Sequence, residues 1–199
     1  MKNSILAILA ITALTACKKN ETTVIDSSAD SSMMVPATDS SMMPMDSATV
    51  SGTSTNMMDQ DKMFADAAAK GGMMEVMLGE TAEMNGMDSK VKALGKMIKE
   101  DHTKANAELK SWAAAANYML PTKLDADQQK MVDDLKMKKG ADFDKAYTYM
   151  MVSDHKKDIA AFKKEASDGA GDLKAFAAKT VPTLEKHLAA SEDAMKALK

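Results

Sequence analysis

The chain contains three histidines, and each stands at an apolar position of a segment with a helical hydrophobic repeat. His102, His155 and His187 belong to three separate segments, and Glu75 holds the same kind of position in a fourth. A buried carboxylate or imidazole is costly unless it is paired, hydrogen-bonded or bound to a metal. We therefore expect these four side chains to meet one another or an ion.

Three imidazoles and one carboxylate are a suitable ligand set for a single Zn²⁺, Fe²⁺, Mn²⁺ or Cu²⁺ ion. Asp101, Asp154 and Asp158 lie close to the histidines along their segments. Carboxylates in such places can orient imidazole ligands by accepting their second N–H. The residue types thus predict a single-ion site with acidic groups around it.

A metal-free polar network explains the same pattern. In this alternative Glu75 is ionised against a protonated histidine, and the other groups bond to Tyr147, Thr180 or carbonyl oxygens. A third alternative is that one of the four groups faces solvent, because three-four spacings can be drawn through many helical sequences. The sequence leaves all three open.

A helical period dominates the chain from Asp59 to its end and predicts the elements that position these groups. We expect long helices over about residues 59–85, 88–116, 142–168 and 172–198, and a short one over about 125–139. Asp142 and Asp172 are expected to cap the last two long helices, and Pro182 to kink or break the final one. The predicted fold is all-α: an antiparallel four-helix bundle over residues 59–199, with the short helix in a crossover between the second and third long helices.

Residues 97–110 and 150–163 resemble each other, and both carry Asp-His at their centre. This similarity suggests that the bundle consists of two related helix pairs.

The first residues have the pattern of a secretory signal. A basic start precedes an apolar run of roughly a dozen residues, which is too short to span a bilayer, and the run ends in Leu14-Thr15-Ala16-Cys17. This ending resembles the bacterial lipobox. It implies a signal peptide over 1–16, a lipidated Cys17, and a cell-envelope lipoprotein anchored in the outer membrane and facing the periplasm. The alternative is an ordinary secreted protein with one thiol.

Residues 17–58 are rich in Ser, Thr, Asp and Met and cannot bury enough apolar surface to offset ordering entropy, so we expect a disordered tether. Its methionines could capture Cu(I) or act as an oxidant sink, and compositional drift is the third explanation. These methionines are Met33, Met34, Met42, Met43, Met45, Met57 and Met58.

The charge pattern argues against nucleic acid as a partner. The chain has no arginine, and its formal net charge is -3. Recognition of phosphate or nucleic acid therefore has little physical support. The expected partner is the membrane, through the lipid anchor, while an envelope protein and a second copy of the chain are left open.

Four motifs resemble a bacterial envelope family known as domain of unknown function 4142, a relative of ferritin-like bundles. They are residues 71–75, residues 101–106, residues 140–147 leading to Asp154-His155, and residues 184–188. The resemblance implies a ferritin-like fold and an envelope location, and the family brings no agreed activity. Its motif residues match at Glu75, His102, His155 and His187.

The ferritin-like di-iron pattern is not met. That site needs a Glu three residues before a metal-binding His on two helices. Here the corresponding residues are Lys99, Val152 and Leu184. We therefore expect metal handling or envelope stress defence at a single ion. The competing hypothesis is a non-catalytic envelope structural or interaction protein. An enzyme is not favoured, although a metal with an open position could activate water or oxygen.

Overall fold

The computed structural model describes residues 58–198, which form five α-helices and no strand. The helices are α1 (Asp59–Asn85), α2 (Ser89–Ala115), α3 (Ala126–Lys136), α4 (Gly140–Asp168) and α5 (Gly171–Ala197). The all-α prediction is confirmed for this part of the chain. The expected signal peptide, Cys17 and the tether methionines before Met58 lie outside the described residues. None of the five helices combines the length and apolar surface that crossing a bilayer requires.

Side chains cap two helices at the predicted places. Asp125 accepts a bond from the Gln128 backbone N–H at 2.9 Å, and the Gln128 side chain accepts from the Asp125 N–H at 3.3 Å, forming a capping box. Asp88 caps α2 by accepting from the Lys90 N–H at 2.7 Å. These bonds satisfy backbone donors that a helix start would otherwise leave unpaired.

The expected caps of α4 and α5 are wrong. Asp142 and Asp172 lie inside the first turns, because α4 begins at Gly140 and α5 at Gly171. Each of these glycines has a positive φ, 57° and 53°, which lets the chain turn into the helix earlier than a residue with a Cβ would allow.

α3 is shorter than predicted, and α5 is not broken at its proline. α3 ends at Lys136, three residues before the expected Lys139. α5 continues through Pro182 without a break, since its buried residues Leu184, His187 and Ser191 continue to pack inward after the proline. Tertiary packing therefore outweighs the single backbone bond that the proline removes.

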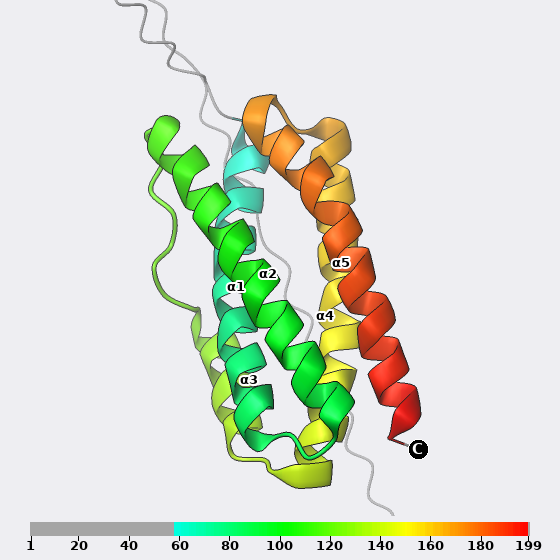
Figure 1. Ribbon diagram of the computed structural model, residues 1–199. Helices are drawn as coiled ribbons and strands as arrows, with labels where there is room; N and C mark the ends of the chain where they lie inside the picture. Colours follow the sequence, from blue (N-terminus) through cyan, green and yellow to red (C-terminus); the bar gives the residue numbers. More distant parts are fainter. Residues whose placement is uncertain (1–57, 199) are drawn as a thin grey trace, which may run out of the picture. The chain divides into compact units, whose positions relative to one another are not determined.

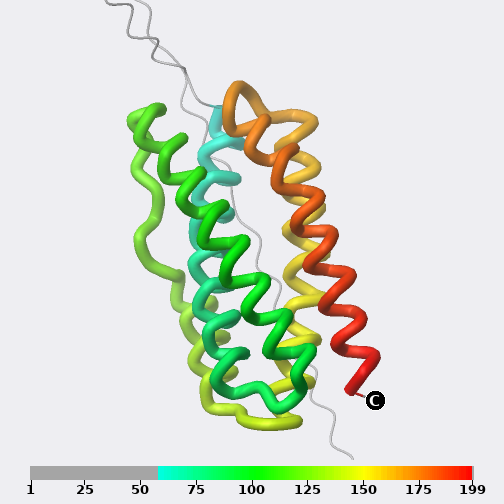
Figure 2. The backbone as a smooth tube through the Cα atoms, in the orientation of Figure 1, coloured from blue at the N-terminus to red at the C-terminus, as the bar shows by residue number. Residues whose placement is uncertain are grey.

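The four long helices pack side by side as two antiparallel pairs, α1 with α2 and α4 with α5. The pairs meet through contacts of α2 with α5 and of α1 with α4. Figures 1 and 2 show that α2 and α4 run in the same direction, so the chain returns along the domain between them. This return segment contains α3, which packs on α1 and α4.

Glycines bring α1 and α2 close together. A Cβ added to Gly79 would lie 2.5 Å from the Gly95 carbonyl oxygen, and one added to Gly95 would lie 2.8 Å from the Gly79 oxygen. Only residues without side chains permit this approach.

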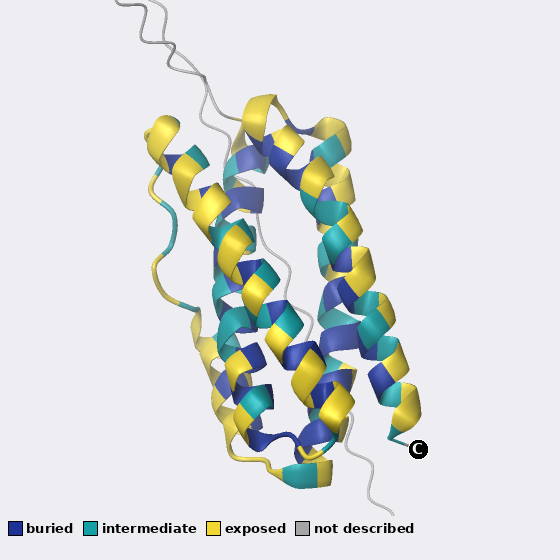
Figure 3. Ribbon diagram, in the orientation of Figure 1, coloured by how far each residue is buried: buried dark blue, intermediate teal, exposed yellow. Residues whose placement is uncertain are grey.

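The buried faces of the helices point toward one another (Figure 3) and form two apolar clusters. One cluster includes Leu78, Ile98 and Met151, and the other includes Phe64, Leu109 and Phe162. On α2, α4 and α5 the predicted His lies between the residues of the two clusters, and on α1 Glu75 lies next to Met74, where the clusters adjoin. The apolar core is thus divided by a polar layer.

Candidate metal centre

Each of the four long helices contributes one buried polar side chain to this layer. Glu75 on α1 is 1% exposed and His102 on α2 is 7% exposed, while His155 on α4 and His187 on α5 are fully buried. Their helical repeats place them inward because each falls in line with apolar core residues one turn away. A solvent-facing position is therefore excluded for all four.

The side chains form a continuous series of contacts. His102 Nε2 lies against Glu75 Oε2, and Glu75 Oε1 is 3.4 Å from His155 Nδ1. His155 Nε2 is 3.2 Å from His187 Nδ1, and His187 Nε2 is 3.1 Å from Asp101 Oδ2. Because Asp101 and His102 are adjacent on α2, the series begins and ends on the same helix and joins all four.

The partners of His155 and His187 determine their tautomers. His155 Nδ1 is 3.0 Å from the Met151 carbonyl oxygen, which can only accept, so this nitrogen carries the proton. His187 Nε2 faces the Asp101 carboxylate and carries its proton for the same reason. The remaining nitrogens, His155 Nε2 and His187 Nδ1, are then both unprotonated and lie 3.2 Å apart. Such an arrangement needs a cation between them, either an additional proton or a metal ion.

The three imidazoles also meet the spatial requirement for a metal site. Each offers one nitrogen, and these nitrogens lie within 4.8 Å of one another. Two ligand nitrogens on a tetrahedral ion, with bonds of about 2.0–2.1 Å, are about 3.3 Å apart. The separation of His155 and His187 is already close to this value. Glu75 does not belong to this compact set, although it contacts two of its members.

Electrostatics keep Glu75 charged and His187 neutral. Burial alone would raise the pKa of Glu75, but the neighbouring His102 and His155 outweigh burial and lower it to about 2. Burial opposes charge on His102 as well, yet Glu75 raises the pKa of this imidazole above its ordinary value. Burial lowers the pKa of His187 to about 4, against the opposing effect of Asp101. His187 is therefore available as a neutral ligand near pH 7.

The three aspartates expected around the site have different surroundings. Asp101 contacts an imidazole, and its pKa is lowered because bonds from His187 and Lys104 outweigh burial. Asp154 places one oxygen 3.5 Å from Lys157, and its other oxygen, Oδ2, is buried without a hydrogen-bond partner. Among the described residues Asp158 forms no hydrogen bond to a histidine, and burial followed by the charge of Glu75 raises its pKa to about 7.

Tyr147 and Thr180 do not bond to the histidines as the metal-free alternative expected. The Tyr147 hydroxyl is buried and has no hydrogen-bond partner in the described part of the chain. Thr180 donates to the Phe176 carbonyl oxygen at 2.8 Å on its own helix. Of the partners expected in that alternative, a histidine in contact with Glu75 and a carbonyl oxygen are present.

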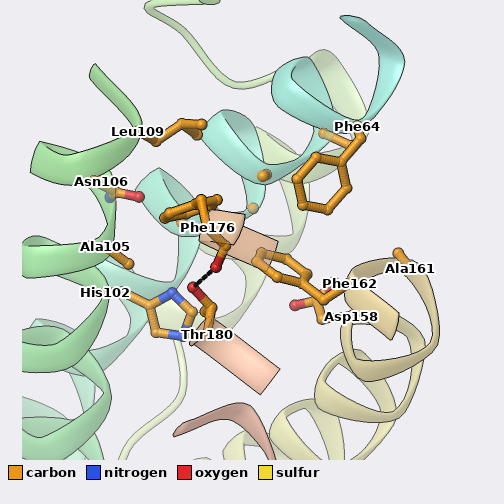
Figure 4. Close-up of a pocket in the computed structure, with 14 residues that line it drawn as sticks. Phe64, His102, Ala105, Asn106, Leu109, Asp158, Ala161, Phe162, Phe176 and Thr180 are labelled. Atoms are coloured by element: carbon orange, nitrogen blue, oxygen red, sulfur yellow. Dashed lines mark hydrogen bonds between the residues drawn. The ribbon is translucent and has the colours of Figure 1, made fainter. Parts of the chain in front are cut away.

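A cavity of about 60 Å³ adjoins the layer, and His102 and Asp158 form part of its wall (Figure 4). The sequence analysis did not find this feature. Its other lining residues come from all four long helices: Phe64, Ala67, Ala68, Gly71, Gly72, Ala105, Asn106, Leu109, Ala161, Phe162, Phe176 and Thr180. The sequence feature that could have indicated the cavity was Gly71, a glycine in the interior of a helix.

Met58 is the only methionine of the expected Cu(I) set within the described residues. It immediately precedes α1 and is 44% exposed. Cu(I) capture by the tether stays a prediction.

Comparisons with known proteins give a family and a fold. A family described as "Domain of unknown function (DUF4142)" matches residues 46–194. The crystal structure of a DUF305 fragment from Deinococcus radiodurans is similar, with a TM-score of 0.62 and 11% sequence identity. The similarity covers 70% of this chain and 97% of that chain, and at this identity it shows the fold alone. Comparison with curated proteins finds no match.

Proposed function

Since the chain belongs to the DUF4142 family, whose description assigns no function, we propose one from the site: the domain binds one transition-metal ion through His102, His155 and His187. One observation carries the proposal. His155 Nε2 and His187 Nδ1 lie 3.2 Å apart, and neither carries a hydrogen in the tautomers that their partners select. A metal ion satisfies both lone pairs at once, and His102 supplies a third nitrogen.

The charges around the imidazoles suit a divalent cation. Glu75 and Asp101 are both ionised at neutral pH, so two negative charges contact the imidazoles, Glu75 at His102 and His155 and Asp101 at His187. They offset the charge of the ion, and the Asp101 contact orients His187. Imidazole ligands suit Zn²⁺, Cu²⁺ and Fe²⁺. Bridging carboxylates for a second iron are absent from the compact ligand set, so we propose a single ion.

A second candidate function is a metal-free structural core. It is favoured by the contact of His102 with Glu75, in which a protonated imidazole and a carboxylate satisfy each other. An additional proton on His155 would then complete the bond to His187. In this case the layer fixes the register of four helices, and the protein serves as an envelope structural or interaction partner.

Elemental analysis of protein purified without a histidine tag distinguishes these functions. We expect about one equivalent of Zn, Fe, Mn or Cu after reconstitution, and loss of metal in His102→Gln and His155→Gln. Lys156→Gln is the matched control, because Lys156 is exposed and adjacent to His155. Less than about 0.2 equivalents of any metal in the reconstituted wild-type protein would contradict the metal function.

We propose that the domain is ferritin-like. The support is its connectivity, because α2 and α4 are parallel and a single long segment crosses between them. Ferritin-like folds have one such crossover.

We also propose that the protein is a periplasm-facing lipoprotein of the outer membrane, in which the bound metal serves metal handling or stress defence. The support is the lipobox-like ending at Cys17 and the apolar run before it. Labelling with a radioactive fatty acid tests this: label is expected in the wild-type protein and not in Cys17→Ser. Equal labelling of the two, or none in either, would contradict the anchor.

A further inference from the structure

Gly71 differs from the other described glycines that lie in helix interiors and not at a helix start. A Cβ added to it would meet no atom within 4 Å, whereas one added to Gly72, Gly79 or Gly95 would collide with a neighbouring helix. These other glycines are explained by close approach. Gly71 is not.

Glycine in a helix interior lowers stability relative to alanine, because it loses more backbone freedom on folding. An alanine would fit at residue 71 without contact, so packing does not require the glycine. Its free side lines the cavity beside His102. The glycine therefore keeps space open at the expense of helix stability.

The cavity wall has an apolar part and a polar part. Phe64 and Phe162 pack edge to face with their ring centres 4.8 Å apart, and Phe176 lies 6.0 Å from Phe162. These rings and Leu109 surround one side, as Figure 4 shows. His102 on α2 and Thr180 on α5 contribute polar atoms to the wall, as Figure 4 also shows.

The lining suits an uncharged occupant. No lysine is among the lining residues, and the only titratable groups are His102 and Asp158. An anion would lie near the Asp158 carboxyl, and the lining residue that can carry a positive charge, His102, is already paired with Glu75. Either kind of ion would lose hydration against the aromatic walls.

The volume limits the occupant to a few atoms. A cavity of about 150 Å³ in another protein holds one benzene molecule. The present cavity is about 60 Å³, so it accommodates two or three non-hydrogen atoms. Ala67 on α1 and Ala161 on α4 are exposed lining residues and mark its opening to solvent.

We propose that this cavity is a binding site for a neutral molecule of two or three non-hydrogen atoms, of the size and polarity of dioxygen, held between the phenylalanine rings and His102. Contact between this ligand and a metal ion bound to His102 would rest on the proposed function. The binding site itself does not depend on the metal.

Xenon is a suitable probe, because it is neutral and similar in size. Crystals of the metal-free protein pressurised with xenon are expected to show one xenon atom bounded by Gly71, Phe162 and Phe176. In Gly71→Leu the added side chain fills this space, and xenon occupancy should fall at least about tenfold. Ala114→Leu, at an exposed position near the end of α2, is the control and should retain the xenon.

Gly71→Ala provides a second measurement that does not depend on the larger variant folding. Its melting temperature should rise by about 3–5 °C, because the helix gains stability without a clash. Absence of xenon from the wild-type cavity, equal occupancy in Gly71→Leu, or a lower melting temperature in Gly71→Ala would each overturn the proposal. Xenon bound in a protein that takes up no metal would support the cavity and contradict the proposed metal function.

Discussion

Asp101 and His187 lie on different helices, α2 and α5, and the carboxylate oxygen Oδ2 of Asp101 is 3.1 Å from Nε2 of His187. The carboxylate accepts a hydrogen bond from the Nε2–H of His187, so Nδ1 carries no proton and is available to a metal ion.

Asp101→Asn is expected to weaken metal binding about 10–100-fold. The asparagine amide can donate to Nε2, which favours the tautomer with a proton on Nδ1. Competition with a chromophoric chelator measures the affinity. Asp193→Asn is the control, because Asp193 contacts only an exposed lysine, Lys196, at 3.3 Å. Unchanged affinity in Asp101→Asn would mean that this contact does not orient a ligand.

Glu75→Gln is expected to reduce the free energy of unfolding of the metal-free protein by about 3 kcal/mol at pH near 6. The substitution removes the charge that stabilises protonated His102 while both groups remain buried. Urea unfolding measures the loss. In the control, Glu192→Gln removes a partly exposed ion pair with Lys156 and should cost less than about 1 kcal/mol. Similar losses in the two variants would argue against a charged pair in the core.

Asp158→Asn should stabilise the metal-free protein at high pH and not at low pH. The pKa of Asp158 is about 7 in the folded protein, above the ordinary 3.8, so the folded state holds a proton that the unfolded state has lost between these values. Stability from this group is therefore present below pH about 4, falls as the pH rises, and is lost above about 7.

The expected gain of Asp158→Asn is on the order of 2 kcal/mol near pH 8, after allowance for partial exposure, and close to zero near pH 4. Denaturant unfolding at the two pH values measures it. Asp134→Asn, at an exposed position paired with Lys130, should show no such difference. A gain of equal size at both pH values would contradict the raised pKa.

Gly79→Ala is expected to destabilise the protein by about 1–3 kcal/mol, because the new Cβ would meet the Gly95 carbonyl of α2 and force the helices apart. Thermal unfolding measures the change. Gly71→Ala is the matched variant on the same helix and should be stabilising by about 1 kcal/mol. Stabilisation by both would show that α1 and α2 do not approach closely at Gly79.

Local signals predicted most of the elements. The helical repeat predicted both ends of α1. Asp88 and Asp125 indicated the starts of α2 and α3, because each caps its helix by accepting a bond from a backbone N–H two or three residues later. The errors at Asp142 and Asp172 came from backbone conformation, since glycines with positive φ start those helices earlier. The break expected at Pro182 does not occur, because the packing of neighbouring helices, which a single helix does not reveal, keeps α5 continuous, while a kink there stays a prediction.

The sequence by itself determined that Glu75, His102, His155 and His187 stand in line with the apolar positions of four helices, because a helical repeat decides which residues share one side of a helix. The structure showed that all four are buried. Only the tertiary structure decided which atoms meet. It paired Asp101 with His187, left Glu75 outside the compact ligand set, and opened a cavity beside Gly71. The physical reason is that distances between side chains of different helices depend on how closely the helices approach and how they are rotated, and no repeat within one helix contains that information.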